Sequence, residues 1–461
     1  MRTCRGRGEG TAHLQSLARF TVLGGALLGL LAVGCGRERV VEMERERLFF
    51  VPIGEGMEQI GVARNHGGAF QGPEHIFFKN GFFFVVDTVN QKIMKVTTLG
   101  DIILVIAKGE PQQDSAQEEV LRTKVRRTYP FQQIGHLAVD GANNIYVENK
   151  TLVREEDEEV VDLIGMEGEH GDSREVYRCR VVKFDRLGAY QYRIGRNGRD
   201  SEPFDYIYRM QVDREGNLVV ITSNEQWSSW TYHAFDQQGT LLMRREIRDE
   251  QIVQEEGEQR AAFILDVVPP VEERQLVYWV SMYETSHDSE DVRREGRWGE
   301  EIAIENMDEL RQDEGQAGGQ MNDLLFYKLL YLELPSLSVR HTHVWETGRK
   351  DPSDTTQEFV GIDGNANGFL WKYVDQNRSI VTIFRPDGSV VARRSFVFDG
   401  DGLWTNVHVS EDGSVTAVKI DNRRVHFYRW RSDRLLEGTS EERTFWELLR
   451  EKYREFTHAN R

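Results

Sequence analysis

The chain has 461 residues, with 58 Lys and Arg against 76 Asp and Glu, a formal net charge of −18 and 39% hydrophobic residues. That length exceeds one small domain, so it favours two domains or one domain built from repeats. The apolar content excludes wholesale disorder. The acidic balance argues against a nucleic-acid partner, because phosphate binding needs clustered Lys and Arg.

The N-terminus begins with several arginines and continues into an apolar run over residues 20–33. This run is shorter than the roughly 20 residues that a membrane-spanning helix needs, and the pattern is typical of a secretory signal. It ends Leu31-Ala-Val-Gly-Cys35, which resembles a bacterial lipobox. The resemblance implies a signal peptide over 1–34 and lipidation at Cys35. An ordinary signal peptide or an uncleaved anchor remains the alternative.

Residues 35–46 are rich in Arg and Glu and are predicted to form a charged tether between the lipid and the folded part. Removal of the signal would also remove Cys4, and acylation would occupy Cys35. Cys179 would then be the one free cysteine, so no intrachain disulfide is possible. A buried, structural thiol is the favoured interpretation of Cys179 over a reactive one.

One pattern recurs after residue 60: a strand, a Val-Asp or similar pair, a Gly/Asn turn and a second strand. Such alternation of short β-rich runs with turn residues indicates an all-β fold. The copies read Leu137-Ala-Val-Asp140-Gly-Ala-Asn-Asn-Ile145, Met210-Gln-Val-Asp213-Arg-Glu-Gly-Asn-Leu218, Val360-Gly-Ile-Asp363-Gly-Asn-Ala-Asn-Gly368 and Val407-His-Val-Ser410-Glu-Asp-Gly-Ser-Val415.

A third strand and a Gly turn follow each hairpin, ending at Gly100, Gly188, Gly239 and Gly388, and a fourth strand closes each unit. Four strands per unit at this spacing predict a β-propeller. We count six units, over 67–109, 129–198, 201–247, 261–346, 357–400 and 403–438, the fourth being degenerate. The strand at 47–53 is left over and is predicted to join the last blade and close the ring.

The Asp…Asn…Lys/Arg-Ile…Gly pattern resembles NHL-type and TolB-like six-bladed β-propellers over residues 47–438. With the lipobox, the chain is similar to spirochaetal propeller lipoproteins. The resemblance implies an exported protein that is lipid-anchored to the bacterial cell envelope, facing the periplasm or the cell surface. It also implies a protein-interaction platform without a cofactor, whose partners are the membrane, through the lipid, and another envelope protein.

Acidic insertions over 154–175 and 284–323 fall between the second and third strands of the second and fourth units. Insertions at equivalent points should emerge on one face of the ring, either as a partner-binding crown or as solvated loops. The spacing of apolar residues over 439–461 predicts an amphipathic helix with an apolar face from Phe445 to Phe456. This helix either packs on the propeller or binds a partner.

The first strand of each blade should line the central channel. Aligning the hairpins places His136, Arg209 and Asn406 at equivalent positions, with Glu74 and His75 near the same level. These five residues are the candidate ligand site at the channel mouth. Some NHL-type lyases bind zinc there through histidines of separate blades, so the resemblance offers a metal-dependent hydrolase or lyase as the alternative function. A polar, water-filled channel is the simpler interpretation.

Three further patterns carry candidate chemistry. Asp363-Gly-Asn-Ala-Asn367 matches the start of a calcium loop, but position twelve is Val374 and the segment is also a blade hairpin. His341 and His343 share one strand face, as a zinc pair does, without a visible third ligand. Trp227 and Trp230 are candidate partner contacts, or they pack on a neighbouring blade. We therefore predict no metal and no catalytic residue.

Two functions remain, with a third beside them. The first is a binding module on an envelope anchor, and the second is an enzyme at the channel mouth. A purely structural envelope component cannot be separated from the first by sequence, because a propeller fold does not determine function.

Overall fold

The computed structural model describes residues 40–64, 70–73, 75–110, 124–152, 177–204, 206–224, 229–248, 260–268, 275–284, 324–334, 336, 338–346, 357–375, 377–398 and 402–436. The chain divides into a first unit over residues 1–41 and a second over 42–461. The predicted signal peptide with Cys35, the helix at 439–461 and the interiors of both acidic insertions lie outside the described residues.

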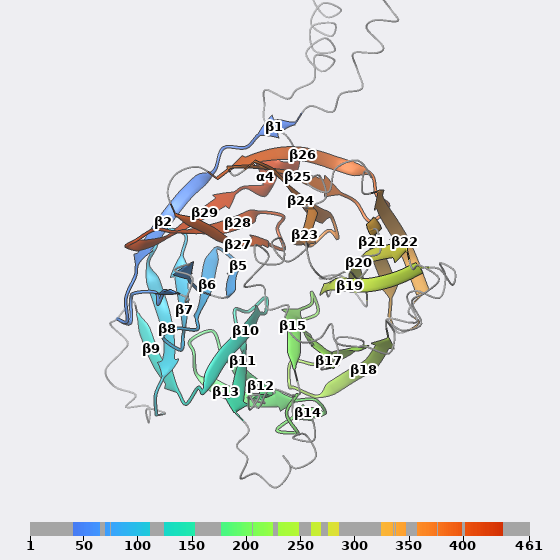
Figure 1. The fold of residues 1–461 in the computed structure, drawn as a ribbon. Helices are drawn as coiled ribbons and strands as arrows, with labels where there is room; N and C mark the ends of the chain where they lie inside the picture. The colour runs from blue at the N-terminus through green and yellow to red at the C-terminus, as the bar shows by residue number, and fades with distance from the viewer. Residues whose placement is uncertain are drawn as a thin grey trace, which may run out of the picture. The chain divides into compact units, whose positions relative to one another are not determined.

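The second unit contains six antiparallel sheets arranged as the blades of a propeller (Figure 1). Blades 1 to 3 are formed by β5 (His75–Lys79), β6 (Phe82–Asp87), β7 (Lys92–Thr97) and β8 (Ile102–Lys108); β10 (Gln133–Val139), β11 (Ile145–Leu152), β12 (Tyr177–Phe184) and β13 (Tyr190–Gly195); and β15 (Ile207–Val212), β16 (Leu218–Ser223), β17 (Ser229–Phe235) and β18 (Leu241–Arg248). Blade 1 carries an added strand, β9 (Val125–Tyr129), which pairs parallel with β8. Blade 2 carries a short added strand, β14 (Gly198–Arg199), which pairs antiparallel with β13.

Blades 4 to 6 are formed by β19 (Arg260–Val268), β20 (Gln275–Glu284), β21 (Leu324–Glu333) and β22 (Ser338–Glu346); β23 (Gln357–Ile362), β24 (Gly368–Asp375), β25 (Arg378–Phe384) and β26 (Val390–Val397); and β27 (Leu403–Val409), β28 (Val415–Ile420), β29 (Arg424–Trp430) and β2 (Glu46–Pro52). The remaining elements are β1 (Val41–Glu42), the pair β3 (Ala63–Arg64) and β4 (Phe70–Gln71), and the single helical turn α4 (Ser432–Leu436). The predicted six blades of four strands are thus confirmed.

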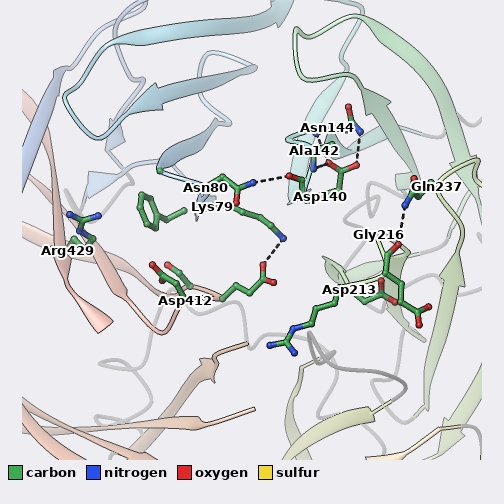
Figure 2. A pocket seen from close by; sticks show the side chains of 17 residues that line it. Lys79, Asn80, Asp140, Ala142, Asn144, Asp213, Gly216, Gln237, Asp412 and Arg429 are labelled. Atoms are coloured by element: carbon green, nitrogen blue, oxygen red, sulfur yellow. Dashed lines mark hydrogen bonds and ion pairs between the residues drawn. The ribbon is translucent and has the colours of Figure 1, made fainter. Parts of the chain in front are cut away.

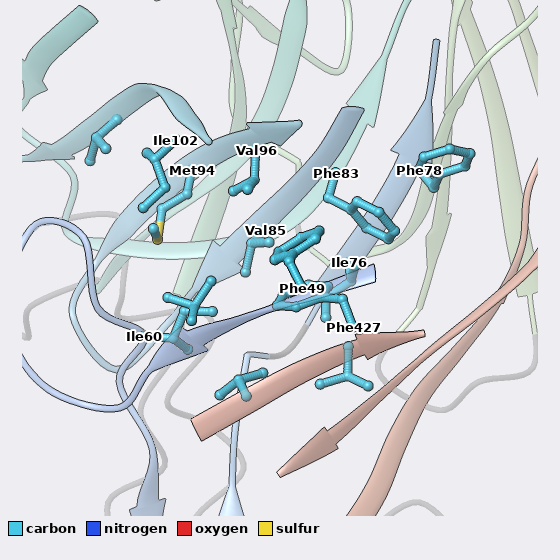
Figure 3. Close-up of a cluster of buried hydrophobic side chains, with 14 of the residues drawn as sticks. Phe49, Ile60, Ile76, Phe78, Phe83, Val85, Met94, Val96, Ile102 and Phe427 are labelled. Carbon is cyan, nitrogen blue, oxygen red and sulfur yellow. The ribbon is translucent and has the colours of Figure 1, made fainter. Parts of the chain in front are cut away.

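Strands inside a blade bury both faces, which is why their sequences read as continuous apolar runs rather than alternating ones. In β6, Phe83 and Val85 belong to the cluster between blades 1 and 6, whereas Phe84 and Val86 belong to the cluster between blades 1 and 2. All four are fully buried (Figure 3 shows the first cluster). Apolar area removed from water on both faces stabilises the ring, and no single blade has this burial alone.

The recurring Val-Asp signature is the turn between the first two strands of a blade. Asp140 Oδ1 accepts hydrogen bonds from the backbone N–H of Ala142 and Asn144, at 2.9 and 2.8 Å. Asp213 and Asp363 repeat the arrangement. At Asp363 both carboxylate oxygens accept bonds from its own turn, and the side chain is 1% exposed. The hairpin interpretation of this segment is therefore favoured over a calcium loop.

The recurring glycines occupy the turn between the third and fourth strands and contact the preceding blade. Gly100, Gly188 and Gly239 have φ of 91°, 79° and 84°. A Cβ at Gly188 would lie 2.8 Å from Leu104 Cδ1 of blade 1, and one at Gly239 2.8 Å from Tyr192 Cε2 of blade 2. Both the left-handed backbone and the close approach require glycine.

The N-terminal strand closes the ring, as predicted. Strand β2 pairs antiparallel with β29, and Phe49 stacks on Phe427 with ring centroids 4.5 Å apart. The segment after β2 is fastened to blade 1: the backbone N–H of Gly61 donates to Asp87 Oδ2 at 2.8 Å, and Lys92 Nζ donates to the carbonyl of Gly56 at 2.6 Å. Lys92 and Asp87 also form a buried ion pair at 3.5 Å.

Residues that flank the first and last strands of the propeller also pack against it. Residues 43–46, assigned to the tether, belong to the propeller: Met43 is buried, and its N–H donates to the carbonyl of Ser395 at 2.9 Å. Arg45 lies 5.4 Å from the centroid of the Trp404 ring and 5.3 Å from that of Tyr428. At the other end the last strand ends at Trp430, and the helical turn α4 follows it with Leu435 buried. Among the described residues, no helix is long and apolar enough to cross a membrane.

Candidate functional site

The innermost strands β5, β10, β15, β19, β23 and β27 surround the central channel (Figure 1). Five of them break register with the second strand at a similar point: between residues 134 and 137, 207 and 209, 264 and 266, 359 and 361, and 405 and 408. A bulge redirects side chains, and bulges occur next to functional sites. His136, Arg209 and Asn406 lie within or at the edge of these bulges.

The structure brings His75 and His136 together, with ring centroids 4.4 Å apart. The bulge that positions His136 depends on its neighbours. The backbone N–H of His136 donates to Glu148 Oε2 at 3.0 Å. A Cβ at Gly135 would lie 2.1 Å from the same oxygen, so a side chain at this position would displace the Glu148 carboxylate.

Burial keeps the imidazoles of the channel neutral at pH 7. Burial lowers the pKa of His75 to about 4, with smaller contributions from the positive charges of Lys150 and Arg209. Burial also lowers the pKa of His136 well below its usual value, and that of His408 to about 4. Arg209 contributes to all three shifts, so its charge lies within electrostatic reach of all three rings.

Arg209 and Asn406 have partners within the protein. Arg209 Nη2 donates to Asp266 Oδ2 of blade 4 at 3.0 Å, and the Tyr208 hydroxyl donates to Asp266 Oδ1 at 2.8 Å. Asn406 Nδ2 donates to the carbonyl of Pro73 at 2.7 Å, which connects blade 6 to the segment before β5. Asn406 therefore helps to hold the ring together at this level.

The alignment of the chain's own hairpins did not identify four residues as candidates at this level: Glu148, Lys150, Asp266 and His408. Asp266 belongs to the degenerate blade, whose hairpin lacks the Val-Asp…Gly-Asn landmark. Glu148 and Lys150 lie on the second strand of blade 2, and the available signal was their position directly after the apolar run Ile145–Val147.

The remaining predicted site residues have three different outcomes. Glu74 and Trp227 lie outside the described residues. Trp230 is corrected: it is 2% exposed and packs edge-on against Tyr208 with centroids 4.7 Å apart, so it cannot contact a partner directly. Its indole fills the interface between blades 3 and 4, which is the packing alternative.

His341 and His343 do not form a metal pair with a third ligand in the described part of the chain. The His343 ring stacks on Phe384 of blade 5 at 5.3 Å, and burial lowers its pKa. Within the described ranges, no group of three His, Cys, Asp or Glu side chains is placed to hold a metal ion. Cys179 is buried, as predicted, and burial raises the pKa of its thiol.

A cavity of about 760 Å³ lies at the other end of the channel, between the hairpins that join the first two strands of the blades (Figure 2). We call this end the hairpin face. Lys79 Nζ pairs with Glu411 Oε2 at 2.8 Å, and Asn80 Nδ2 donates to the carbonyl of Gly141 at 3.2 Å. Arg214 donates to the carbonyl of Gly364 in blade 5. These polar and charged groups connect blades to one another.

Comparison with known proteins gives no family. No family model matches the chain, and no curated protein matches it. Similar solved structures include a streptogramin B lyase, with 8% identity, a TM-score of 0.33 and coverage of 80% of this chain and 85% of that one. The β-propeller domain of Nup133 from Vanderwaltozyma polyspora has 10% identity and a TM-score of 0.36, and the match covers 77% of this chain and 93% of that one. The β-propeller domain of the Trilobed protease from Pyrococcus furiosus has 9% identity and a TM-score of 0.34, and the match covers 78% of this chain and 94% of that one. At these values no function is transferred to the present chain.

Proposed function

We propose that this chain is a lipid-anchored protein of the bacterial cell envelope whose propeller is a platform for another envelope protein. One observation carries the proposal: almost all of the net charge lies in two insertions whose flanking strands open on the same face of the ring. Residues 154–175 hold ten acidic and two basic side chains, and residues 284–323 hold thirteen and four. These insertions therefore account for −8 and −9 of the net −18.

The topology supports a shared face for the two insertions. The first follows β11 and returns at β12, and the second follows β20 and returns at β21. In each blade the end of the second strand pairs with the start of the first: Gln133 pairs with Lys150, and Arg260 with Glu284. Because all blades run in the same sense around the ring, both insertions leave from the face opposite the hairpin face. We call it the insertion face.

Exposed apolar side chains gather at strand ends on the same face. Leu152, Tyr206 and Leu403 mark the ends of second strands or the starts of first strands in blades 2, 3 and 6, and Tyr373 and Val374 do so in blade 5. Exposed apolar residues bordered by charge are typical of protein-binding surfaces. An acidic border favours a partner with basic side chains around its contact.

The anchor and the family assignment form part of the same proposal. Lipidation at Cys35 would attach the chain to a membrane through its N-terminal segment, and the repeat pattern supports an NHL-like or TolB-like relationship. Metabolic labelling with a fatty-acid analogue tests the anchor directly. Label that is retained in the wild type and lost in Cys35→Ala supports it, whereas equal labelling of both, or of neither, refutes it.

The platform is tested by affinity purification of the tagged protein from detergent-solubilised cells. The variant lacks residues 155–175 and 285–322. The matched control keeps both lengths but replaces their Asp and Glu by Asn and Gln, which separates charge from bulk. A stoichiometric partner that is lost in both variants supports an acidic binding surface. A partner retained by both, or a protein purified alone, refutes the proposal.

The alternative, a metal-dependent hydrolase or lyase at the channel, has one observation in its favour: His75 and His136 form a close pair of neutral imidazoles. The charges of Lys150 and Arg209 beside them oppose a bound cation. Metal analysis of the purified protein decides this alternative. Stoichiometric metal that disappears in His136→Ala would support the enzyme, and metal-free protein would remove its metal-dependent form.

A further inference from the structure

The cavity of the hairpin face departs at one hairpin from the repeat that builds the others. In three hairpins a carboxylate accepts hydrogen bonds from its own turn: Asp140, Asp213 and Asp363. The equivalent residue of blade 6 is Ser410, which is 2% exposed and lines the cavity. Its hydroxyl oxygen is buried and has no hydrogen-bond partner among the described residues. A buried hydroxyl without a partner is unfavourable, so a ligand that supplies the partner gains free energy.

The turn of blade 6 does not need this hydroxyl. Asp412 takes over the role that the first carboxylate has in the other hairpins. Its Oδ1 accepts from the N–H of Ser414 at 2.9 Å, and its Oδ2 accepts from the Ser414 hydroxyl at 3.1 Å. The Ser410 hydroxyl is therefore spare as far as the hairpin is concerned.

Negative charge prevails among the side chains that line the cavity, with five acidic against three basic ones. The acidic ones are Asp140, Asp213, Glu215, Glu411 and Asp412. Lys79 pairs with Glu411 at 2.8 Å, and Arg429 pairs at 2.8 Å with Glu46, which does not line the cavity. In the part of the chain that the structure describes, Asp213, Glu215 and Asp412 have no ion pair. The cavity thus favours a positively charged occupant.

The third basic residue, Arg214, has contacts with blade 5. Its guanidinium donates to the carbonyl of Gly364. Burial raises the pKa of the neighbouring Asp363, and the positive charge of Arg214 opposes this rise. The guanidinium is therefore within electrostatic reach of a carboxylate that does not line the cavity, and this carboxylate offsets part of its charge.

The carboxylates of blades 3 and 6 retain capacity to accept hydrogen bonds. Glu215 Oε2 accepts from Asn217 Nδ2 at 3.0 Å, and each oxygen of Asp412 accepts one bond from Ser414. An ionised carboxylate has about four lone-pair sites and no donor, and a hydroxyl can also accept. An ammonium group has three donors and no acceptor, so it matches both the charge and the open acceptors.

We propose that the hairpin-face cavity binds a small organic cation with a primary ammonium group, through Glu215 of blade 3 and through Asp412 and Ser410 of blade 6 (Figure 2). Its volume of about 760 Å³ lies in the range of small-molecule sites, about 300–1,000 Å³. The cavity and the insertion face lie at opposite ends of the channel. This inference therefore does not depend on the platform or on the lipid anchor.

Isothermal titration calorimetry of the full chain tests the site, with putrescine as the probe and sodium chloride to hold the ionic strength constant. Tetramethylammonium is the control cation, because it has no N–H donor. Ser410→Ala removes the spare hydroxyl. Its matched control is Ser223→Ala, because the Ser223 hydroxyl is also buried without a partner among the described residues but does not line the cavity.

A second variant, Glu215→Gln/Asp412→Asn, removes two negative charges and keeps an acceptor oxygen in each turn. Its matched control is Asp200→Asn/Glu202→Gln, which removes the same charge next to β14, outside the lining of the cavity. This control separates the local charge of the cavity from the net charge of the protein.

We expect saturable binding of putrescine that is about tenfold or more weaker in Glu215→Gln/Asp412→Asn, several-fold weaker in Ser410→Ala and unchanged in both controls. Absence of saturable putrescine binding overturns the inference. Equal weakening in Asp200→Asn/Glu202→Gln overturns it as well, because net charge alone would then explain the binding. Equally tight binding of tetramethylammonium, or magnesium ions that displace putrescine at constant ionic strength, would also refute an ammonium site.

Discussion

Phe49 is an aromatic side chain of the strand that closes the ring, and its removal gives a quantitative test. Phe49 is 7% exposed in the cluster between blades 6 and 1. Its ring stacks on Phe427 at 4.5 Å and meets Phe83 edge-on at 5.4 Å. Burial of about 150 Å² at about 25 cal/mol per Å² amounts to about 4 kcal/mol. We expect Phe49→Ala to lower the free energy of unfolding by about 3–5 kcal/mol, as core Phe truncations do.

The neighbouring Phe50 provides the matched control. It lies on the same strand with its side chain on the other face, 41% exposed, over the Arg424 guanidinium at 4.1 Å. Phe50→Ala should cost about 1 kcal/mol. Urea unfolding followed by tryptophan fluorescence measures both. If Phe49→Ala destabilises the protein no more than Phe50→Ala does, β2 does not close the ring in the way described.

Three further predictions concern a turn, a hairpin and the channel. Gly188→Ala should lower the free energy of unfolding by about 1–2 kcal/mol, because φ is 79° and the new Cβ would meet Leu104. The control is Gly141→Ala, whose Cβ would have nothing within 4 Å, and it should change the free energy of unfolding by less than about 0.5 kcal/mol. Equal effects of the two substitutions in thermal unfolding would contradict the close approach. Asp140→Ala should lower the free energy of unfolding by about 1–2 kcal/mol, because the turn loses its side-chain acceptor. Asp140→Asn keeps an acceptor for the turn and should lower it clearly less. If the urea midpoints of the two variants coincide, the hydrogen bonds of Asp140 do not stabilise the turn. His75 and His408 have pKa values of about 4 against 6.5 when unfolded, so the unfolded chain takes up protons first and stability is lost as pH falls from about 6.5 towards 4. Between pH 7 and 5 we expect a loss of about 1 kcal/mol per imidazole, after allowance for solvent in the channel, and a shallower pH dependence in His75→Asn; an unchanged dependence would refute the assignment.

The periodic parts of this sequence predict the fold because each repeat has a local physical cause. The Asp of each hairpin bonds to its own turn, and the Gly of each outer turn combines a left-handed backbone with a close contact. Both signals can be read from a few consecutive residues. The predicted closing strand followed from the same logic, since an apolar strand left over before the first blade needs a partner.

The site was less predictable because its geometry depends on bulges and on pairs of residues far apart in sequence. Alignment of the hairpins placed His136 and Arg209 at one level of the innermost strands, with His75 beside them, and the structure brings His75 and His136 together. It did not identify Asp266, because the degenerate blade lacks the turn that served as the reference. The sequence left Trp230 open between a partner contact and packing on a neighbouring blade, because a tryptophan near a loop looks the same in sequence whether its ring faces solvent or the next blade.

The closure of blade 6 has a consequence for the order of folding. Glu46 and Arg429 form an ion pair although 383 positions separate them along the chain. During synthesis β2 emerges first, yet its partner β29 emerges after all the other blades. Such pairing at long sequence separation is slow, and until it occurs both strands present open edges. The ring therefore acquires its last stabilising interface only when the whole propeller sequence is present, so a chain truncated before β29 would lack closure and retain an aggregation-prone edge.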